Sequence, residues 1–428
     1  MVFRKAGIAA ALLASLFTAS SAKPQSMELS EDRVRSVAVD QINGKAYLGT
    51  NTSPGKIIYF DLPTCREEGK LTLDPSESYI STLLLDPIAG KLYAGTDTEP
   101  ARVVRSSSVN PIKEDSVAYN RFASENFIST GSIDYRNGFA YFGTWTTGGK
   151  ILCLDLNNFT PTGTIRLVVQ NEFLGSSGFD ELNGKIYFGS ESGVVTKLDT
   201  ETFTVDSTLP LSVWQTVLMS SSVDETNNRA YFATMLNPSR LTEVNLQTFQ
   251  DERVLELPTD NNVRTMVQDG DFAYLGTYTT PGRIIKVNLR DMTRVDSIDL
   301  PNEELLNASF SYGNFVYFAT DTSPSRLIRV DKNTFRICPC AYPSSTPDLR
   351  VRRNGRDVEL TWGADVNSDS YGIDREANVT RVGLDRAFTP TRVSTVTATG
   401  YTDVNAVGDG NDLIFYSVRG VNCNGEGN

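Results

Sequence analysis

The chain has 428 residues, of which 39% are hydrophobic, and its formal net charge at pH 7 is -12. A length of this size predicts about two to three domains with ordinary hydrophobic cores, which excludes a wholly disordered protein. The acidic charge disfavours nucleic acid as a partner. The sequence contains no histidine, which removes Ser-His-Asp and Cys-His catalytic arrangements and the commonest transition-metal ligand. We therefore predict neither a metal site nor a cofactor.

Residues 1–22 have the pattern of a cleaved secretory signal peptide. A basic start with Arg4 and Lys5 precedes an apolar run that ends at Phe17, and small residues then lead to Ala22. The apolar run is too short to span a bilayer, and no later stretch reaches the roughly 18 apolar residues of a membrane helix. We expect cleavage after Ala22, a secreted or cell-surface protein, and no transmembrane segment.

An internal repeat dominates the sequence between about residues 27 and 342. Its first tyrosine recurs at intervals of 43 to 48 residues, at Tyr47, Tyr93, Tyr141, Tyr187, Tyr231, Tyr274 and Tyr317. In most copies the tyrosine-bearing strand leads into a loop of the type Gly-Thr-x-Thr-x-Pro-Gly-basic, clearest from Gly276 to Arg283. Turn sequences such as Asn43-Gly44 divide each copy into four short strands.

Seven four-stranded units of this length fit blades around a central channel. We predict an all-β fold with a seven-bladed β-propeller over residues 23–342. A solenoid is the competing repeat architecture, but its units are usually shorter and need terminal caps. The seventh unit runs into Cys338-Pro339-Cys340 without a clear fourth strand. We therefore expect residues 25–30 to complete the seventh blade and join the ends of the ring.

The five cysteines allow up to two disulfides in an exported monomer. Cys153 lies in a third strand, where we expect a small buried apolar side chain. For the pair at Cys338 and Cys340, bonding to Cys65 across the closing seam or to Cys423 remains open, because spacing alone does not assign connectivity.

Two registers of charged residues flank the loops that join the second and third strands, and both are predicted to lie on one rim of the ring. Six loops end in a basic residue: Lys56, Arg102, Lys150, Arg240, Arg283 and Arg326. The segments before the first strands carry an acid in five units: Glu31, Glu77, Glu125, Asp260 and Glu303. Unit four lacks both charges, with Val194 and Asn171, whereas unit five keeps Arg240 opposite Gln215. We expect the acid and base of one unit to form an exposed pair worth about 0 to 1 kcal/mol.

The alternative is that this charged rim surrounds a ligand site, because loops on a rigid scaffold commonly carry binding residues. Trp145 and Tyr278 lie within the loops, where they would either stack on a sugar or peptide or pack as loop aromatics. Unit four, with its shorter loop, would then offer the gap for a ligand. Hydroxyl groups would come from the loop threonines Thr50, Thr96, Thr144, Thr277 and Thr320.

A Pro/Ser-rich linker at residues 343–347 separates the repeats from residues 348–428. The second part resembles a fibronectin type III module, with Val358 to Trp362 as its tryptophan-bearing strand and Tyr371 to Asp374 as the next. Tyr401 to Asp403 and Phe415 to Val421 match two later strands. We expect the module either to lack its last edge strand or to be truncated.

Over about residues 27–340 the repeats resemble the bacterial and archaeal YVTN/Vgb-type secreted propellers. The resemblance implies a seven-bladed fold and a function among surface-layer proteins, adhesion proteins, lactone hydrolases and a streptogramin lyase. The lyase activity depends on histidines, which this chain lacks. No lactonase metal-site pattern transfers residue by residue, so the resemblance implies no catalytic residues.

Together these features predict a secreted or cell-surface binding or adhesion protein that recognises an extracellular protein or glycan with one face of the propeller. A hydrolase or lyase with carboxylates at the channel mouth is the first alternative, and it requires an acid with a displaced pKa and no basic partner. A structural surface-layer component is the second alternative.

Overall fold

The described part of the chain consists of β-strands and loops and contains no α-helix. The computed structural model describes residues 26–120, 125–168, 172–338, 349–363, 368, 370–379, 391–406, 413–422 and 425–426. The predictions for the signal peptide, the linker at 343–347, Asn171, Cys340 and Cys423 lie outside these residues. Contacts divide the described residues into two compact units, 26–338 and 349–426.

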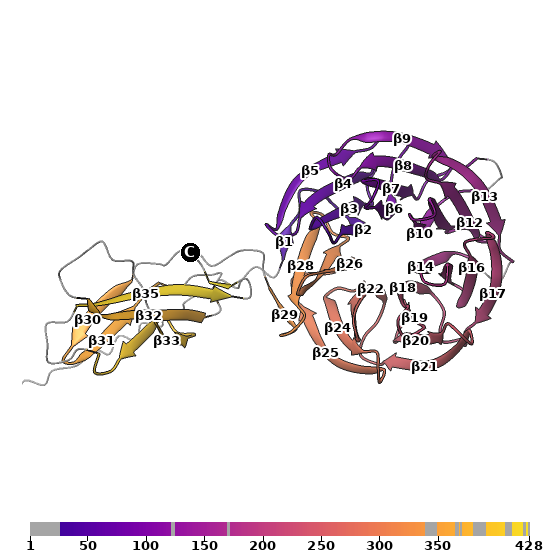
Figure 1. Ribbon diagram of the computed structural model, residues 1–428. Coiled ribbons are helices and arrows are strands. Elements are labelled where there is room, and N and C mark those ends of the chain that lie inside the picture. Colours follow the sequence, from indigo (N-terminus) through magenta and orange to yellow (C-terminus); the bar gives the residue numbers. More distant parts are fainter. Residues whose placement is uncertain are drawn as a thin grey trace, which may run out of the picture. The chain divides into compact units, whose positions relative to one another are not determined.

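In the first unit the described strands form seven antiparallel sheets, six with four consecutive strands and a seventh with five. Figure 1 shows the sheets arranged as blades around a central opening. Each innermost strand contacts the innermost strands of the two neighbouring sheets, and the last of them contacts the first. The expected four-stranded units are therefore confirmed, and the sheets follow one another around a ring.

The innermost strands are β2 (Val34–Asp40), β6 (Ile80–Asp86), β10 (Ile128–Asp134), β14 (Leu174–Asp180), β18 (Leu218–Asp224), β22 (Val263–Asp269) and β26 (Leu306–Tyr312). The second strands are β3 (Lys45–Thr50), β7 (Lys91–Thr96), β11 (Phe139–Thr144), β15 (Lys185–Ser190), β19 (Arg229–Thr234), β23 (Phe272–Thr277) and β27 (Phe315–Thr320). The third strands are β4 (Lys56–Asp61), β8 (Arg102–Ser107), β12 (Lys150–Asp155), β16 (Val194–Asp199), β20 (Ser239–Asn245), β24 (Gly282–Asn288) and β28 (Arg326–Asp331). The outermost strands of the first six sheets are β5 (Arg66–Thr72), β9 (Lys113–Ala118), β13 (Thr160–Arg166), β17 (Thr204–Pro210), β21 (Gln250–Leu257) and β25 (Thr293–Leu300).

The seventh sheet combines the two ends of the repeat region. Strand β1 (Met27–Glu28) pairs with β28, with Met27 opposite Leu327, and β29 (Arg336–Ile337) pairs with the other end of β28. This confirms the expectation that residues 25–30 complete the seventh unit. Leu29, directly after β1, is buried in a cluster that joins the first and seventh sheets.

Cysteine chemistry reinforces the same seam. Cys65 and Cys338 are both disulfide-bonded, and the guanidinium of Arg329 donates hydrogen bonds to their sulfur atoms at 3.3 and 3.4 Å. Arg329 belongs to the seventh sheet and Cys65 to the turn between β4 and β5 of the first. Cys153 is a buried free cysteine, as expected.

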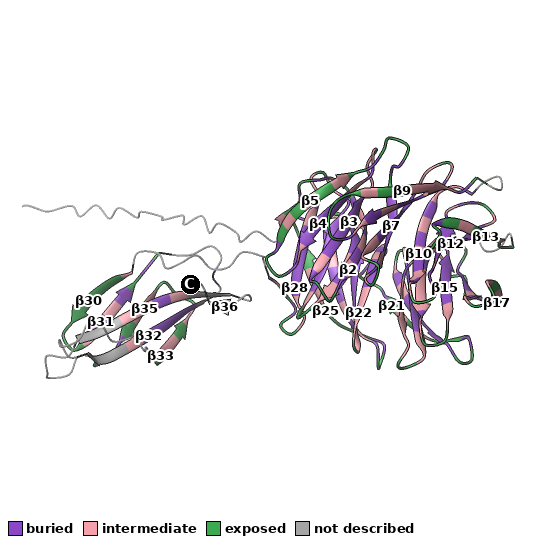
Figure 2. Ribbon diagram, turned by 45° about the horizontal axis from the view of Figure 1, so that its top comes forward, coloured by how far each residue is buried: buried purple, intermediate pink, exposed green. Residues whose placement is uncertain are grey.

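The hydrophobic core lies between neighbouring sheets. Second and third strands are buried on both faces because each sheet packs between two others, whereas outermost strands such as β5 alternate between exposed and half-buried residues (Figure 2). Tyr47 is buried, and its hydroxyl donates to the carbonyl of Ser108 in the next sheet at 2.8 Å. The repeated tyrosines therefore pack sheet against sheet, as the sequence predicts.

Local turn chemistry fixes both ends of each innermost strand. The carboxylate of Asp40 accepts hydrogen bonds from the amides of Ile42 and Asn43 at 3.0 and 2.9 Å, so this aspartate forms the turn as predicted. At the other end, the residue before each innermost strand has a left-handed backbone with φ between 53° and 57°: Arg33, Tyr79, Phe127, Phe173, Val217, Asn262 and Leu305.

These left-handed residues bind the loops of adjacent sheets together. The amide of Asn262 donates to the carbonyl of Leu236 in the preceding sheet, and its carbonyl accepts from the amide of Tyr278 in its own sheet, both at 2.8 Å. The equivalent hydrogen bonds recur around the ring. We call the side of the ring that carries these residues and the loops between second and third strands the loop face.

Residues 349–426 contain two antiparallel sheets that share one hydrophobic cluster. One sheet contains β30 (Arg350–Asn354), β31 (Asp357–Thr361) and β34 (Gly400–Asp403), and the other contains β32 (Ser370–Val379), β33 (Thr391–Val396), β35 (Leu413–Asn422) and β36 (Gly425–Glu426). Trp362 packs edge-on against Tyr371, with ring centroids 5.4 Å apart. The two-residue strand β36 pairs with β35. A short edge strand therefore occupies the position at which we expected the last strand to be absent.

Candidate functional site

A β-bulge near the start of each innermost strand builds the candidate site. The pairing register shifts at the second residue of all seven strands. A bulge leaves one residue outside the hydrogen-bond ladder and re-aims its side chain. The bulged residues all line the central cavity: Arg35, Ser81, Ser129, Gly175, Met219, Arg264 and Asn307.

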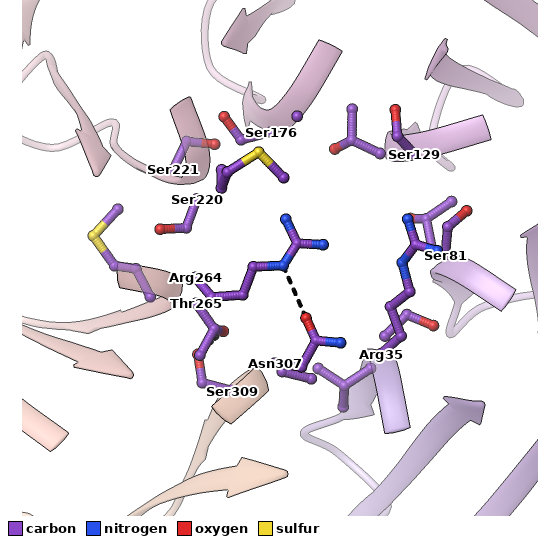
Figure 3. A pocket seen from close by; sticks show the side chains of 18 of the residues that line it. Arg35, Ser81, Ser129, Ser176, Ser220, Ser221, Arg264, Thr265, Asn307 and Ser309 are labelled. Atoms are coloured by element: carbon purple, nitrogen blue, oxygen red, sulfur yellow. Dashed lines mark hydrogen bonds between the residues drawn. The ribbon is translucent and has the colours of Figure 1, made fainter. Parts of the chain in front are cut away.

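The central cavity has a volume of about 250 Å³ and is lined by all seven innermost strands. Its walls are mostly hydroxyl-bearing, because serine and threonine occupy many of the lining positions. Small residues suit the place where seven strands converge. Two arginines break this pattern, Arg35 from the first sheet and Arg264 from the sixth, and Figure 3 shows both side chains extending into the cavity.

Arg264 is the cation with the fewest protein contacts in this cavity. Its Nε donates to Oδ1 of Asn307 at 2.9 Å, and within the described residues no carboxylate forms an ion pair with it. Burial, together with the nearby charge of Arg35, lowers the pKa of Arg264 to about 10. The guanidinium therefore remains a cation at neutral pH, although the ring surrounds it and destabilises its charge.

The other charges at the channel mouth are paired across sheets. Arg35 donates to a carboxylate oxygen of Asp97 at 2.7 Å. Arg33 pairs with Asp321 at 2.9 Å, and the Tyr278 hydroxyl donates to the same carboxylate at 2.8 Å. Both aspartates belong to loops between second and third strands. With three arginines and two aspartates, this part of the mouth carries one excess positive charge.

Several serines in the cavity wall have buried hydroxyls without a partner among the described residues. Ser176 and Ser220 are 4% and 8% exposed, and their Oγ atoms, like that of Ser221, are closed off from solvent and have no hydrogen-bond partner there. The Ser129 hydroxyl, in contrast, donates to the carbonyl of Leu174 in the next sheet at 2.5 Å. In Figure 3 the three serines border the space into which Arg264 extends. The cavity thus combines a cation that has no ion pair among the described residues with a hydroxyl-bearing wall.

Three of the five predicted rim pairs are present among the described residues, and the pairing of Glu125 with Lys150 stays a prediction. Glu31 pairs with Lys56, Asp260 with Arg283 at 2.8 Å, and Glu303 with Arg326 at 3.7 Å. The acids are buried, with side-chain exposures of 7%, 0% and 5%. The expectation of exposed pairs is therefore wrong for the acidic partners, because the segment before each innermost strand is folded under the loop of the preceding sheet. The carbonyl of Glu303, for example, accepts a hydrogen bond from the amide of Gly282 at 2.8 Å.

Glu77 departs from the predicted pairing. It pairs with Lys113 of β9 at 2.8 Å, not with Arg102, and the described residues contain no ion-pair partner for Arg102. The fourth strand therefore supplies a base that the loop-based prediction did not consider. Lys70 of β5 and Arg294 of β25 similarly add a second base to Glu31 and Asp260.

Units three and five, on either side of unit four, also contain neutral contacts at the rim. Glu125 accepts a hydrogen bond from the Thr164 hydroxyl at 2.6 Å. Burial and the charge of Arg166 lower the pKa of Lys150, although the Glu125 charge acts in the opposite direction.

In unit five, Gln215 donates to the Thr242 hydroxyl at 2.8 Å, while Arg240 pairs with Glu256 at 3.0 Å. In unit four, the amide of Val194 donates to the Ser190 hydroxyl at 3.0 Å. The ligand gap suggested for unit four stays a prediction.

The loop threonines are structural. The Thr277 hydroxyl accepts a hydrogen bond from the amide of Arg283 at 2.9 Å and shares another with Thr279 at 2.7 Å. Equivalent hydroxyls accept from the first amide of the third strand throughout the ring. All five threonines proposed as ligand donors are buried. The expectation that they contact a ligand is therefore not supported by their geometry.

Three aromatic residues on the loop face differ in their contacts. Trp145 packs against Phe173, with ring centroids 5.4 Å apart, and Tyr278 is held through its hydroxyl by Asp321. Both are partly exposed loop aromatics. Trp214, in the segment before β18, is 68% exposed and lies near the Arg240 guanidinium, 5.9 Å from its ring centroid. Its exposure makes Trp214 the best placed of the three to contact a ligand.

Sequence reasoning missed the channel residues because it looked for site residues only in the loops and in the segments before the first strands. A signal was present: when the units are aligned on the last residue of the first strand, an aspartate in six of them, Arg35 and Arg264 fall at the same register, where other units have Ser, Gly, Met or Asn. The sequence did not predict that side chains at this position face the channel, because strand alternation does not reveal a bulge.

Comparisons with known proteins identify no relative from which a function could be inferred. No protein-family model matches the chain, and no curated protein sequence matches it. Among the described residues, no helix has the length and apolar character needed to cross a membrane. The described residues also contain no group of three or more Cys, Asp or Glu side chains placed to hold a metal ion.

Proposed function

We propose that the protein is an extracellular recognition protein that binds a glycan through its loop face, with the central cavity as the middle of the binding surface. The observation that carries this proposal is the polar lining of the cavity around a cation. Arg264 has no ion pair among the described residues, and many of the lining residues are serine or threonine. Buried polar groups are normally satisfied, so groups left over in a cavity indicate a ligand or ordered water.

The proposal includes a closed seven-bladed β-propeller and a fibronectin type III-like second module. Contacts between β26 and β2 and the pairing of β1 with β28 support ring closure. The two sheets around Trp362 support the module assignment. Disulfide bonding of Cys65 and Cys338 supports an oxidising compartment, consistent with the secretory signal expected from residues 1–22.

A rigid cavity surrounded by exposed loop residues suits a glycan better than an enzyme substrate. Four of the rim acids carry ion pairs with bases, so these carboxylates serve to hold the loops. Trp214 offers an exposed aromatic face beside this rim, and aromatic faces commonly pack against sugars and other flat apolar surfaces. A protein ligand remains the competing outcome of the experiment below.

The test is binding of the full chain to an array of extracellular glycans and proteins. We expect binding to at least one glycan class, weakened about tenfold by Trp214→Ala because a central aromatic anchor is lost. Arg290→Gln is the matched surface control, since Arg290 is 77% exposed in its pair with Asp271. Binding to proteins alone, or to nothing on the array, would overturn the proposal.

A hydrolase is a second candidate because of one observation at Glu303. Glu303 and Arg326 line a cavity of about 440 Å³, and burial raises the pKa of Glu303. A carboxyl group with a raised pKa suits general acid catalysis. Turnover of a lactone, ester or glycoside by the full chain, abolished by Glu303→Gln and retained by Glu304→Gln, would establish this candidate in place of simple binding.

A further inference from the structure

We infer that the central cavity binds the anionic group of an acidic sugar, a carboxylate or a sulfate, between Arg264 and Arg35. This inference rests on the proposed glycan-binding function and names the class of glycan. It depends on three features of the cavity: its charge, its unused hydrogen-bonding groups and its size.

Charge is the first feature. The Arg35 guanidinium is partly neutralised by Asp97 at 2.7 Å, whereas Arg264 donates to the neutral amide of Asn307 and forms no ion pair within the described residues. The charges of Asp321 and Asp97 favour the Arg264 cation from a longer distance, but burial and the charge of Arg35 outweigh them and lower its pKa. An anion in the cavity would supply the missing counter-charge and could accept two parallel hydrogen bonds from the free edge of the Arg264 guanidinium.

The position of Asp321 and Asp97 strengthens the assignment to the cavity. Both carboxylates lie in the loops at the mouth, where Arg33, Arg35 and Tyr278 engage them. They are therefore engaged by other donors, and although their charges act on Arg264, neither forms an ion pair with it, which leaves one excess positive charge. A bound anion completes the arrangement without displacing an existing ion pair.

Hydroxyl chemistry is the second feature, and it favours a sugar over other anions. Ser177 and Ser309 are half-buried in the cavity wall, and each hydroxyl retains hydrogen-bonding capacity beyond the bonds it makes within the protein. A hydroxyl both donates and accepts, and rotation about χ1 lets it follow the polar groups of a ligand. The other groups of a sugar ring need both kinds of partner, whereas an acidic peptide offers mostly acceptors around its carboxylate.

Size is the third feature. The cavity volume of about 250 Å³ is below the roughly 300 to 1,000 Å³ of pockets that enclose drug-sized ligands. It therefore suits one sugar residue with its acidic group inserted, while the rest of a longer glycan would extend over the loop face. Trp214 lies on that face, so one glycan chain would contact both features.

The experiment is isothermal titration calorimetry of the full chain with galacturonate, glucuronate, galactose 6-sulfate, galactose, inorganic sulfate and triglutamate. We expect the acidic sugars to bind, with galactose and inorganic sulfate at least tenfold weaker, and the preference between carboxylate and sulfate identifies the source of the anion. Affinity should fall as salt concentration rises, because the interaction is between charges.

Variants assign the binding to the cavity. Arg264→Gln should weaken acidic-sugar binding by roughly 10- to 100-fold, since a charge-assisted hydrogen bond is lost, and Arg264→Lys should restore part of it. Arg290→Gln should bind as the unchanged protein does. Removing an enclosed unpaired charge is not expected to unfold the ring, and equal thermal unfolding of the variants checks this.

Each remaining outcome decides against the inference. Equal affinity for galactose and galacturonate, unchanged affinity in Arg264→Gln, stronger binding of triglutamate, or no binding by any acidic sugar would overturn it. The proposed function fails separately. An array glycan whose binding depends on Trp214 but not on Arg264 leaves the function intact and removes the inference, whereas binding of free uronate without any array ligand does the reverse.

Discussion

Glu31 and Glu303 occupy equivalent places in two sheets, yet their carboxylates differ in ionisation. Burial raises the pKa of both groups, but for Glu31 the hydrogen bonds and charges of Lys56 and Lys70 outweigh burial and bring the pKa below its ordinary value. Glu303 has only the more distant Arg326, at 3.7 Å, and the Ser26 hydroxyl, so burial prevails and its pKa is raised. The second base at Glu31, Lys70, therefore decides whether the pKa of the carboxyl group is lowered or raised.

This difference predicts opposite pH dependences. The folded-state pKa of Glu31 is lowered, so this residue stabilises the fold at pH values above 4.5, the ordinary pKa of glutamate. The contribution is lost as the pH falls through the folded-state pKa. Glu303, with its raised pKa, contributes stability below 4.5 that is lost as pH rises through the folded-state pKa. At pH 7, Glu31→Gln should therefore lower the free energy of unfolding by about 1 to 3 kcal/mol, and Glu303→Gln should change it by less than about 0.5 kcal/mol.

Urea denaturation at pH 7 and at a series of lower pH values measures both effects. The gap between the two variants should narrow as the pH falls through the folded-state pKa of Glu31, where the carboxylate of the unchanged protein takes up a proton. A gap that persists at low pH, or a larger loss for Glu303→Gln at pH 7, would contradict the assignment of the two pKa directions.

At the scale of the element, β1 shows how a two-residue strand can stabilise the seam between the first and seventh sheets. Its pairing with β28 brings Leu29 into a cluster that contains residues of the first and seventh sheets. Leu29 is 2% exposed, and its amide donates to the carbonyl of Ser325 at 2.9 Å. The strand therefore matters mainly because it places one buried side chain at the seam.

Leu29→Ala should lower the free energy of unfolding by about 2 to 5 kcal/mol, because a buried leucine is replaced by a cavity. Ile42→Ala provides the matched control: Ile42 is 84% exposed, so its truncation should change stability by no more than about 0.5 kcal/mol. Chemical denaturation of the full chain compares them. Similar losses for the two variants would mean that the seam does not depend on β1.

The bulges of the innermost strands are the element-scale feature that creates the candidate site. A regular strand would place Arg264 in the hydrogen-bond ladder, with its side chain directed by simple alternation. The shift between Val263 and Thr265 leaves Arg264 outside the ladder, and the side chain lines the cavity. The same shift in the first sheet brings Arg35 into the same space.

At the scale of the whole molecule, the ring depends on the contact between its first and last sheets. Cys65 belongs to the first sheet, and its disulfide-bonded sulfur accepts a hydrogen bond from Arg329 of the last. A cross-link restricts the unfolded chain and so favours the folded state. The seam therefore combines strand pairing and apolar packing, with disulfide-bonded cysteines beside it.

Cys65→Ser should lower the free energy of unfolding by about 2 to 4 kcal/mol under oxidising conditions, and added reductant should destabilise this variant less than the unchanged protein. Thermal and urea unfolding with and without reductant measure the effect. Cys153→Ala is the control, because Cys153 is a free cysteine and its loss should not alter the response to reductant. Equal stability of Cys65→Ser and the unchanged protein would rule out a stabilising role for this cross-link.

The sequence by itself determined the repeated architecture and the place where it closes. Strand patterns, Asn-Gly turns and the tyrosine period are local signals, and the shortage of a fourth strand after Lys332 pointed to residues 25–30. Three ion pairs were also predictable, because loss of both charges in one unit indicates that acid and base interact. Glu31 with Lys56 is one such pair.

Only the tertiary structure decided which groups are buried, which second partners they have and what faces the channel. Lys113 reaches Glu77 because the outermost strand returns past the loop, a proximity that residue spacing does not encode. Arg264 faces the cavity because a bulge interrupts strand alternation, and Ser176 meets the same cavity from a different sheet. The candidate site brings together side chains from separate repeats, so it exists only once the sheets are arranged around their common centre.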